Sequence, residues 1–211
     1  ATKGANPLQG VILDYYLTEK ADTNLLKLEI LDSNNRLIRT YTNKKDEDFK
    51  PYPGGPSPAV LIPSEKGLNR FAWNLRGENI TPSIPGLSVL AGYAGYLSSP
   101  GKYRAKLTYK GSTVETTMDV LQDPNLKVNN SEWNEQQQYL LRISKDLSDI
   151  YSSVNHMRTV KKQLEGYNEL MKDIKEDKEL VDKGNELKKK IDQWESNLIE
   201  TRQTTPQDLV C

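Results

Sequence analysis

The chain contains very little of the residues that most often carry catalysis or hold metal ions. Its 211 residues include one cysteine, Cys211, and one histidine, His156. One cysteine cannot form an internal disulfide, and a Ser-His-Asp triad or a Cys-His pair would have to use His156. This histidine lies in a segment of helical periodicity beside the apolar Met157, so a surface position is the simpler interpretation. We therefore expect no active site built on histidine or on a thiol.

The sequence also lacks an excess of charge of either sign and any long apolar run. Lysine plus arginine number 29, as do aspartate plus glutamate, so no overall field attracts nucleic acid or an anionic membrane. No apolar run approaches the ~20 residues of a membrane-spanning helix. The first ten residues lack the apolar core of a signal peptide. The chain begins without methionine and ends on an apolar stretch, and we expect it to be a piece of a longer protein, with a helical part that is truncated.

Recognised catalytic and metal-binding motifs are absent from the sequence. Neither glycine-rich phosphate loops nor nucleophile elbows nor zinc-protease motifs occur. Two acidic stretches, Asp46–Phe49 and Lys175–Glu179, lack the glycine spacing of a calcium loop, and we interpret them as solvated charge. Paired carboxylates for glycoside hydrolysis are assembled in space, so spacing cannot nominate them. We predict no catalytic residues, no metal ion and no cofactor.

What the chain does contain changes in character near residue 123. Before that point, short segments alternate apolar and polar residues and are separated by turns, a pattern typical of an antiparallel β-sandwich. Val11–Leu17 and Leu26–Ile30 show this alternation, and Asp32–Asn35 has the turn residues of a hairpin that returns along Arg36–Thr42. We predict an immunoglobulin-like or fibronectin-III-like antiparallel β-sandwich over residues 1–123.

Two later segments, residues 67–77 and 100–111, supply the predicted core of this sandwich. In the first, the apolar residues share one face of a strand, while two arginines and Asn74 point the other way. A large aromatic at the centre of such a strand is most often core. The predicted core residues are Phe71, Trp73, Leu75, Tyr103 and Leu107.

Long connections interrupt the strands at residues 44–67 and 77–101. Loops of more than ~12–15 residues are usually functional or disordered. Tyr52, Tyr93 and Tyr96 lie in them and offer flat rings that could stack on sugars, which makes them possible ligand-binding residues. The alternative is that Tyr93 and Tyr96 pack over the edge of the sandwich.

After residue 123 the apolar period becomes helical. A heptad seam is carried by Trp133, Leu140, Leu147 and Val154 and by Ile143, Ile150, Met157 and Leu164. A second series comprises Leu180, Leu187, Ile191, Trp194 and Leu198. We predict a long antiparallel α-helical hairpin over residues 124–211, with helices at about 131–165 and 176–202. An intermolecular coiled coil is the alternative arrangement for these seams.

The order of four motifs resembles a known family. NPLQGVILDYYL, LLKLEILDSNNRLIRTY, GLNRFAWNLRG and PGKYRAKLTYKG, within residues 6–122, resemble the C-terminal region of bacterial, Bacteroidetes-type sortilin-like BNR-repeat proteins named glycosyl hydrolases. The resemblance implies an immunoglobulin-like sandwich similar to that of the flagellar hook-capping protein, preceded by a β-propeller. It also implies secretion to the periplasm or cell surface. Where that family often has aspartate after the tryptophan, this chain has Asn74.

These observations favour a structural function over a catalytic one. Every candidate residue has an ordinary structural explanation, and the resemblance would place any hydrolase site in the propeller. We predict a non-catalytic accessory region that packs on or positions a neighbouring domain of the same protein. The alternative is a carbohydrate-binding module that uses loop aromatics to bind glycan.

Overall fold

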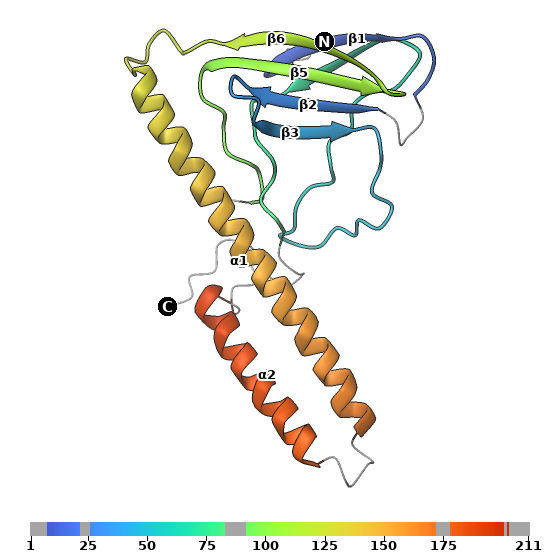
Figure 1. The fold of residues 1–211 in the computed structure, drawn as a ribbon, viewed down its shortest axis with the longest axis vertical. Helices are drawn as coiled ribbons and strands as arrows, with labels where there is room; N and C mark the ends of the chain where they lie inside the picture. The colour runs from blue at the N-terminus through green and yellow to red at the C-terminus, as the bar shows by residue number, and fades with distance from the viewer. Residues whose placement is uncertain (1–7, 22–25, 83–91, 172–177, 201, 203–211) are drawn as a thin grey trace, which may run out of the picture. The chain divides into compact units, whose positions relative to one another are not determined.

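The structure is a computed structural model that describes residues 8–21, 26–82, 92–171, 178–200 and 202. It contains six strands and two helices in these residues (Figure 1). Their order is β1 (Val11–Leu17), β2 (Lys27–Asp32), β3 (Leu37–Thr42), β4 (Gly67–Trp73), β5 (Gly101–Tyr109), β6 (Ser112–Val120), α1 (Asn130–Met171) and α2 (Lys178–Leu198).

The chain divides into two compact units, and each is made of several segments. The first comprises Ala1–Lys50, Ser57–Asn79 and Ala94–Ile143, and the second comprises Pro51–Pro56, Ile80–Tyr93 and Ser144–Cys211. From the sequence we predict a single division of the chain, into residues 1–123 and 124–211. The compact units differ because α1 contributes its first turns to one unit and the rest to the other, and because parts of both long loops belong to the second unit.

The first unit holds two antiparallel sheets. Four strands pair in the order β3-β2-β5-β6, and β1 pairs with β4 in a separate two-stranded sheet. Figure 1 shows the four strands side by side in that order. The β2–β3 connection is the expected hairpin, in which Asn35 adopts a positive φ of 62°. Asparagine tolerates this left-handed conformation better than most residues, which is why it suits the turn.

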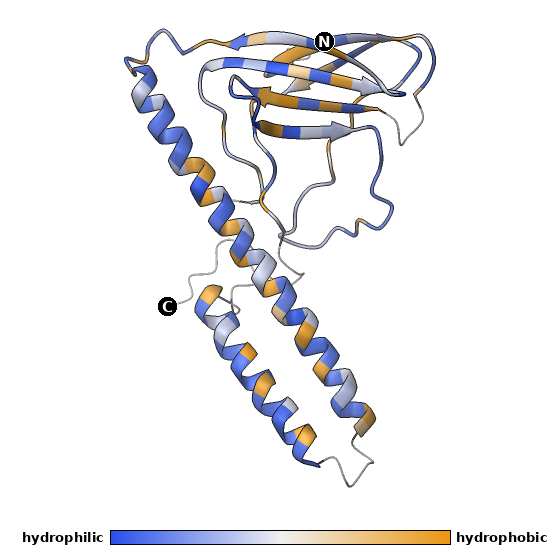
Figure 2. Cartoon of the chain, viewed as in Figure 1, coloured by the Kyte–Doolittle hydropathy of each residue, from blue (hydrophilic) through white to orange (hydrophobic). Residues whose placement is uncertain are grey.

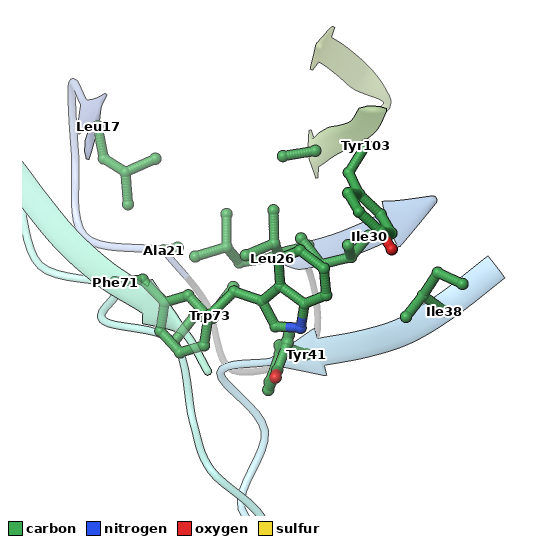
Figure 3. Close-up of a cluster of buried hydrophobic side chains, with 12 residues drawn as sticks. Leu17, Ala21, Leu26, Ile30, Ile38, Tyr41, Phe71, Trp73 and Tyr103 are labelled. Carbon is green, nitrogen blue, oxygen red and sulfur yellow. The ribbon is translucent and has the colours of Figure 1, made fainter. Parts of the chain in front are cut away.

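One hydrophobic core draws residues from both sheets. Trp73, on β4, is 0% exposed and lies at the centre of the cluster, next to Phe71 and Leu26 (Figure 3). Tyr103 is buried in the same cluster, and Leu107 packs against it. The alternation of apolar and polar residues along the strands places one set of side chains in this core and the other on the surface.

Leu75 does not continue the β4 strand, contrary to the sequence-based interpretation. The strand ends at Trp73, and Leu75 has a φ of 62°, in the left-handed region. The indole Nε1 of Trp73 donates a hydrogen bond of 3.0 Å to the carbonyl of Arg76, which holds the chain in this turn. Leu75 still packs against the core, but it reaches the core from the turn rather than from a strand face.

Helix α1 begins with a reciprocal cap. The Asn129 side chain accepts a hydrogen bond from the backbone of Glu132 at 3.0 Å, and the Glu132 carboxylate accepts one from the backbone of Asn129 at 2.9 Å. Such a capping box satisfies two amides that the first helical turn leaves without partners. The helix continues to Met171, beyond the predicted end near residue 165, so Gly166 lies inside it. The reversal predicted between the two helices, within residues 165–179, therefore does not begin before Met171, and residues 172–177 fall outside the described residues.

The second unit contains polar contacts between α1 and α2 that run in opposite directions along the two helices. Arg158 pairs with Glu195, Glu165 with Lys188 at 3.0 Å, and Asn168 with Asn185 at 3.0 Å. As the α1 partner advances along the chain, the α2 partner retreats by the same number of residues. The two helices are therefore antiparallel where they meet.

The face of α2 that is buried is not the predicted one. Ile191 is buried as expected, but Leu180, Leu187, Trp194 and Leu198 are between 38% and 52% exposed. The less exposed positions include Val181, Lys188 and Glu195, each one residue after a predicted seam position. One residue corresponds to about 100° of rotation around the helix. The polar pairs with α1, and Gly184, which lies against Asn168, fix this rotation instead of leucine packing.

Candidate functional site

A polar cleft of about 320 Å³ lies in the first unit. Three segments form it: the β2–β3 turn, the residues that lead into β5, and the first turns of α1. Its lining includes Asp32, Arg36, Ser98, Ser99, Lys102, Tyr103, Trp133, Asn134 and Gln137. These residues come from distant parts of the sequence, and the fold of this unit brings them together.

The carboxylate of Asp32 is occupied by the turn that it begins. Its Oδ1 accepts hydrogen bonds of 2.9 Å from the backbone amides of Asn34 and Arg36. Its Oδ2 lies 2.9 Å from the Arg36 guanidinium. A carboxylate that holds a turn in this way is satisfied as an acceptor and is poorly placed to exchange protons with a ligand. We assign Asp32 a structural role at the edge of the cleft.

Gln137 joins α1 to the segment before β5. Its Oε1 accepts hydrogen bonds from the Ser99 backbone amide at 2.8 Å and from the Ser99 hydroxyl at 2.7 Å. The Tyr103 hydroxyl donates to the Ser99 carbonyl at 2.6 Å, and burial raises the pKa of Tyr103 above its ordinary value. The wall of the cleft is therefore a connected set of neutral polar groups.

Two buried polar atoms in this wall have no hydrogen-bonding partner in the structure. They are Gln137 Nε2 and Ser98 Oγ, and their residues are 8% and 5% exposed. A buried amide donor without an acceptor costs about 1–3 kcal/mol. A hydroxyl group, from water or from a ligand, would satisfy both atoms because it donates and accepts hydrogen bonds. The cleft is therefore chemically suited to a neutral hydroxylated molecule.

Trp133 supplies the aromatic surface of the cleft. Its Nε1 donates a hydrogen bond of 2.8 Å to Gln122 Oε1, which fixes the orientation of the half-buried indole. Asn130, Asn134 and Gln138 are exposed beside it on α1. An aromatic ring next to amide groups can stack on an apolar sugar face and bond sugar hydroxyls. Among the described residues that line the cleft, Asp32 is the one carboxylate, whereas glycoside hydrolysis ordinarily needs two.

The tyrosines proposed from sequence as ligand-binding residues are not among the residues that line the cleft. In the second unit, Tyr93 is 5% exposed, and its ring packs on Tyr151 with 6.0 Å between centroids. In the first unit, the half-buried ring of Tyr96 covers Gly77 so closely that a Cβ there would lie 2.6 Å from it. Tyr52, in the second unit, is also half-buried and lies against Gly55. Packing therefore occupies part of each ring.

The cleft was missed by motif-based reasoning because its residues are ordinary and come from three segments. One signal was available in the helix. Asn130, Asn134 and Gln137 recur at a spacing of four and three residues, which places three amides on one face of α1. Trp133 lies among these amides, but the heptad pattern identifies it only as the first residue of an apolar seam.

The other candidate features form no site within the described residues, and Cys211 lies outside them. His156 is exposed on α1. The described residues contain no cluster of three or more histidine, cysteine, aspartate or glutamate side chains that could hold a metal ion. Within the same residues, neither helix has the length and apolar character required to cross a membrane.

Comparison with known proteins gives no relative for this chain. No family model, curated protein or solved structure matches it.

Proposed function

We propose that this chain is a non-catalytic accessory region of a larger secreted protein, and that it packs on or positions a neighbouring domain. In this proposal the two sheets of the first unit form an immunoglobulin-like β-sandwich, and the two helices form an antiparallel hairpin. The neighbour is a β-propeller, and the protein acts in the periplasm or at the cell surface. The resemblance of four sequence motifs to the region that follows a propeller supports these details.

The exposed apolar face of α2 carries the proposal. Leu180, Leu187, Trp194 and Leu198 fall within about 40° of one another around the helix. Apolar positions recur along α2 in Figure 2, and these four are 52%, 38%, 51% and 43% exposed. A row of large, partly exposed apolar side chains on one side of a helix can mark an interaction surface. We refer to these four residues as the α2 face.

A calorimetric titration tests this function. The chain is titrated with the separately expressed domain encoded immediately before Ala1, after both are shown to be folded. We expect saturable binding with one-to-one stoichiometry, weakened about tenfold or more by Leu187→Lys. Leu170→Lys, which places the same charge at an exposed α1 leucine of the same unit, is the matched control and should bind normally. An absence of binding by the wild-type chain would refute the proposal.

A second candidate function is glycan binding in the polar cleft. It is favoured by one specific observation: a half-buried tryptophan lies beside two buried polar atoms that have no partners, Gln137 Nε2 and Ser98 Oγ. In this function Trp133 stacks on the sugar ring, and the cleft amides bond its hydroxyls. The stacking aromatic therefore differs from the loop tyrosines considered from sequence.

Titration with neutral oligosaccharides tests this second function. Cellotetraose, xylotetraose and mannotetraose are suitable probes because they present neutral hydroxyls in different configurations. Trp133→Ala should abolish any binding, whereas Tyr93→Ala combined with Tyr96→Ala should leave cleft binding intact. Loss of binding in the double tyrosine variant but not in Trp133→Ala would indicate that the loop tyrosines bind the sugar. If the wild-type chain binds none of the probes, glycan recognition in the cleft is contradicted.

A further inference from the structure

A second depression, of about 250 Å³, adjoins the polar cleft of the first unit. The two share lining residues from the start of the β2–β3 turn and from the beginning of β5, namely Asp32, Ser33, Lys102 and Tyr103. The second depression is also lined by Arg104 of β5 and Thr117 of β6. The polar surface therefore extends beyond the cleft in which Trp133 lies.

The lining of these two depressions carries an excess of positive charge. Among the described residues it includes three cations, Arg36, Lys102 and Arg104, and one carboxylate, Asp32. Arg36 lies 2.9 Å from the Asp32 carboxylate, and Arg104 lies 3.2 Å from Glu115, which lines neither depression. The excess is local, because the whole chain has as many acidic as basic residues.

Lys102 is the cation that both depressions share. Its Nζ lies 3.4 Å from Oδ1 of Asp119, and these two side chains are 81% and 60% exposed. An exposed ion pair at such a distance contributes little free energy, so a ligand can compete for the lysine at small cost. The ammonium group offers three hydrogen-bond donors and no acceptor.

The inner wall of the cleft has donors to offer but few acceptors left. Oε1 of Gln137 already accepts two hydrogen bonds from Ser99, and Oδ1 of Asp32 already accepts two from backbone amides. The Nε2 donor of Gln137 has no partner, although its residue is only 8% exposed. A ligand for this surface should therefore be rich in acceptors. A carboxylate has acceptor oxygens together with the negative charge that strengthens a hydrogen bond from lysine.

We infer that the cleft and the adjoining depression bind an acidic oligosaccharide, with Trp133 stacked on one sugar and Lys102 in contact with a sugar carboxylate. This inference rests on the second candidate function, glycan binding in the cleft. A neutral sugar satisfies the polar wall alone, whereas a uronic acid also meets the cation that both depressions share. Nucleic acid is a poorer ligand, because three cations and one carboxylate leave an excess of two charges for a chain that carries one negative charge per nucleotide.

Calorimetric titration with tetragalacturonate tests the inference. Its methyl ester is the matched control probe, because it has the same sugar chain without the negative charges. We expect tetragalacturonate to bind about tenfold or more tightly than the ester, and the difference should shrink as the salt concentration rises. Lys102→Gln should remove most of this difference. Lys106→Gln, on the same strand but outside both linings, should retain it.

The outcomes separate the acidic preference from glycan binding itself. If the acid and its ester bind equally, or Lys102→Gln behaves as the wild type, the acidic preference is wrong, and glycan binding stands if Trp133→Ala abolishes it. If neither the acid nor any neutral probe binds, both are refuted. If tetrathymidylate binds as tightly as tetragalacturonate, or Trp133→Ala leaves tetragalacturonate binding unchanged, the surface attracts anions without recognising a sugar, and the inference is overturned.

Discussion

Trp73 and Tyr103 meet edge to face across the two sheets, with their ring centroids 5.1 Å apart and their planes inclined at 62°. One residue comes from β4 and the other from β5, so this contact ties the small sheet to the large one. Edge-to-face pairs contribute about 0.5–1.5 kcal/mol beyond the burial of their surface. The contact makes Trp73 central to the stability of the first unit rather than to binding.

Trp73→Ala should lower the free energy of unfolding by about 3–5 kcal/mol, because it removes a fully buried aromatic side chain. Trp194→Ala is the matched control. Its side chain is 51% exposed, so we expect a change of less than about 0.5 kcal/mol. Urea unfolding followed by circular dichroism measures both. Equal effects of the two substitutions would contradict the assignment of Trp73 to the core.

Substituting only Arg158 of the ion pair between Arg158 and Glu195 should strongly lower the free energy of unfolding. Glu195 is 6% exposed, and the Arg158 guanidinium contacts its carboxylate. Arg158→Ala leaves that carboxylate buried without its partner, at a cost of about 3–5 kcal/mol. Lys161→Ala breaks a pair with Asp192 that is more exposed, and should cost about 1 kcal/mol or less.

The combined substitution of Arg158 and Glu195 by leucine tests whether the ion pair itself stabilises the fold. Because this double substitution leaves no unpaired buried charge, we expect its free energy of unfolding to equal or exceed that of the wild type. A loss as large as that of Arg158→Ala alone would show that the pair itself is needed. Thermal unfolding of the three variants in parallel supplies the comparison.

Gln137→Leu should destabilise the first unit by about 1–3 kcal/mol, because the buried Oε1 is the acceptor for the Ser99 amide and hydroxyl. Gln138→Leu makes the same change at the next residue, which is exposed, and should be nearly neutral. Chemical unfolding of both variants decides the matter. Similar stabilities for the two variants would contradict the claim that Gln137 stabilises the first unit by linking α1 to Ser99.

High pH should lower the free energy of unfolding of the first unit, because ionisation of its buried tyrosines favours the unfolded state. Burial raises the pKa of Tyr15 to about 12, and it also raises the pKa of Tyr41 and of Tyr103. An unfolded tyrosine titrates near pH ~10. A phenol whose folded pKa is higher therefore contributes its full stabilisation below about pH 10 and loses it as the pH rises toward about 12.

Tyr15→Phe tests this dependence directly. We expect the free energy of unfolding to be nearly constant up to about pH 9 and to fall above about pH 10, with a smaller fall in the variant. Tyr139→Phe changes a tyrosine that is 59% exposed and should leave the fall unchanged. A wild-type stability that stays flat through about pH 12 would contradict the burial of these hydroxyl groups.

The strands were largely predictable from sequence because burial on one face of a sheet imposes an alternating pattern. β1, β2, β3 and β5 coincide closely with the alternating segments. Leu75 was misplaced because alternation does not show where a strand stops. The stop depends on the positive φ of Leu75 and on the hydrogen bond from Trp73 to the Arg76 carbonyl, and neither is visible in apolar spacing.

The helices were predictable in existence but not in rotation. The heptad pattern indicated two helices, yet the face of α2 that meets α1 is displaced by one residue. Polar pairs such as Glu165 with Lys188 set the rotation of α2 about its own axis, and a pattern of apolar residues does not reveal such pairs. The cleft was harder still, because Ser98 and Gln137 acquire their significance only when the fold buries them together.

The most direct test of the docking account uses the three tryptophans as reporters. With 5-fluorotryptophan incorporated, Trp73 reports on the core, Trp133 on the cleft and Trp194 on the α2 face. Fluorine NMR is recorded before and after addition of the unlabelled neighbouring domain. The account predicts that the Trp194 resonance shifts and loses its sensitivity to solvent deuteration, while Trp73 stays unchanged. A Trp194 resonance that remains exposed to solvent under saturating neighbour would contradict docking through α2.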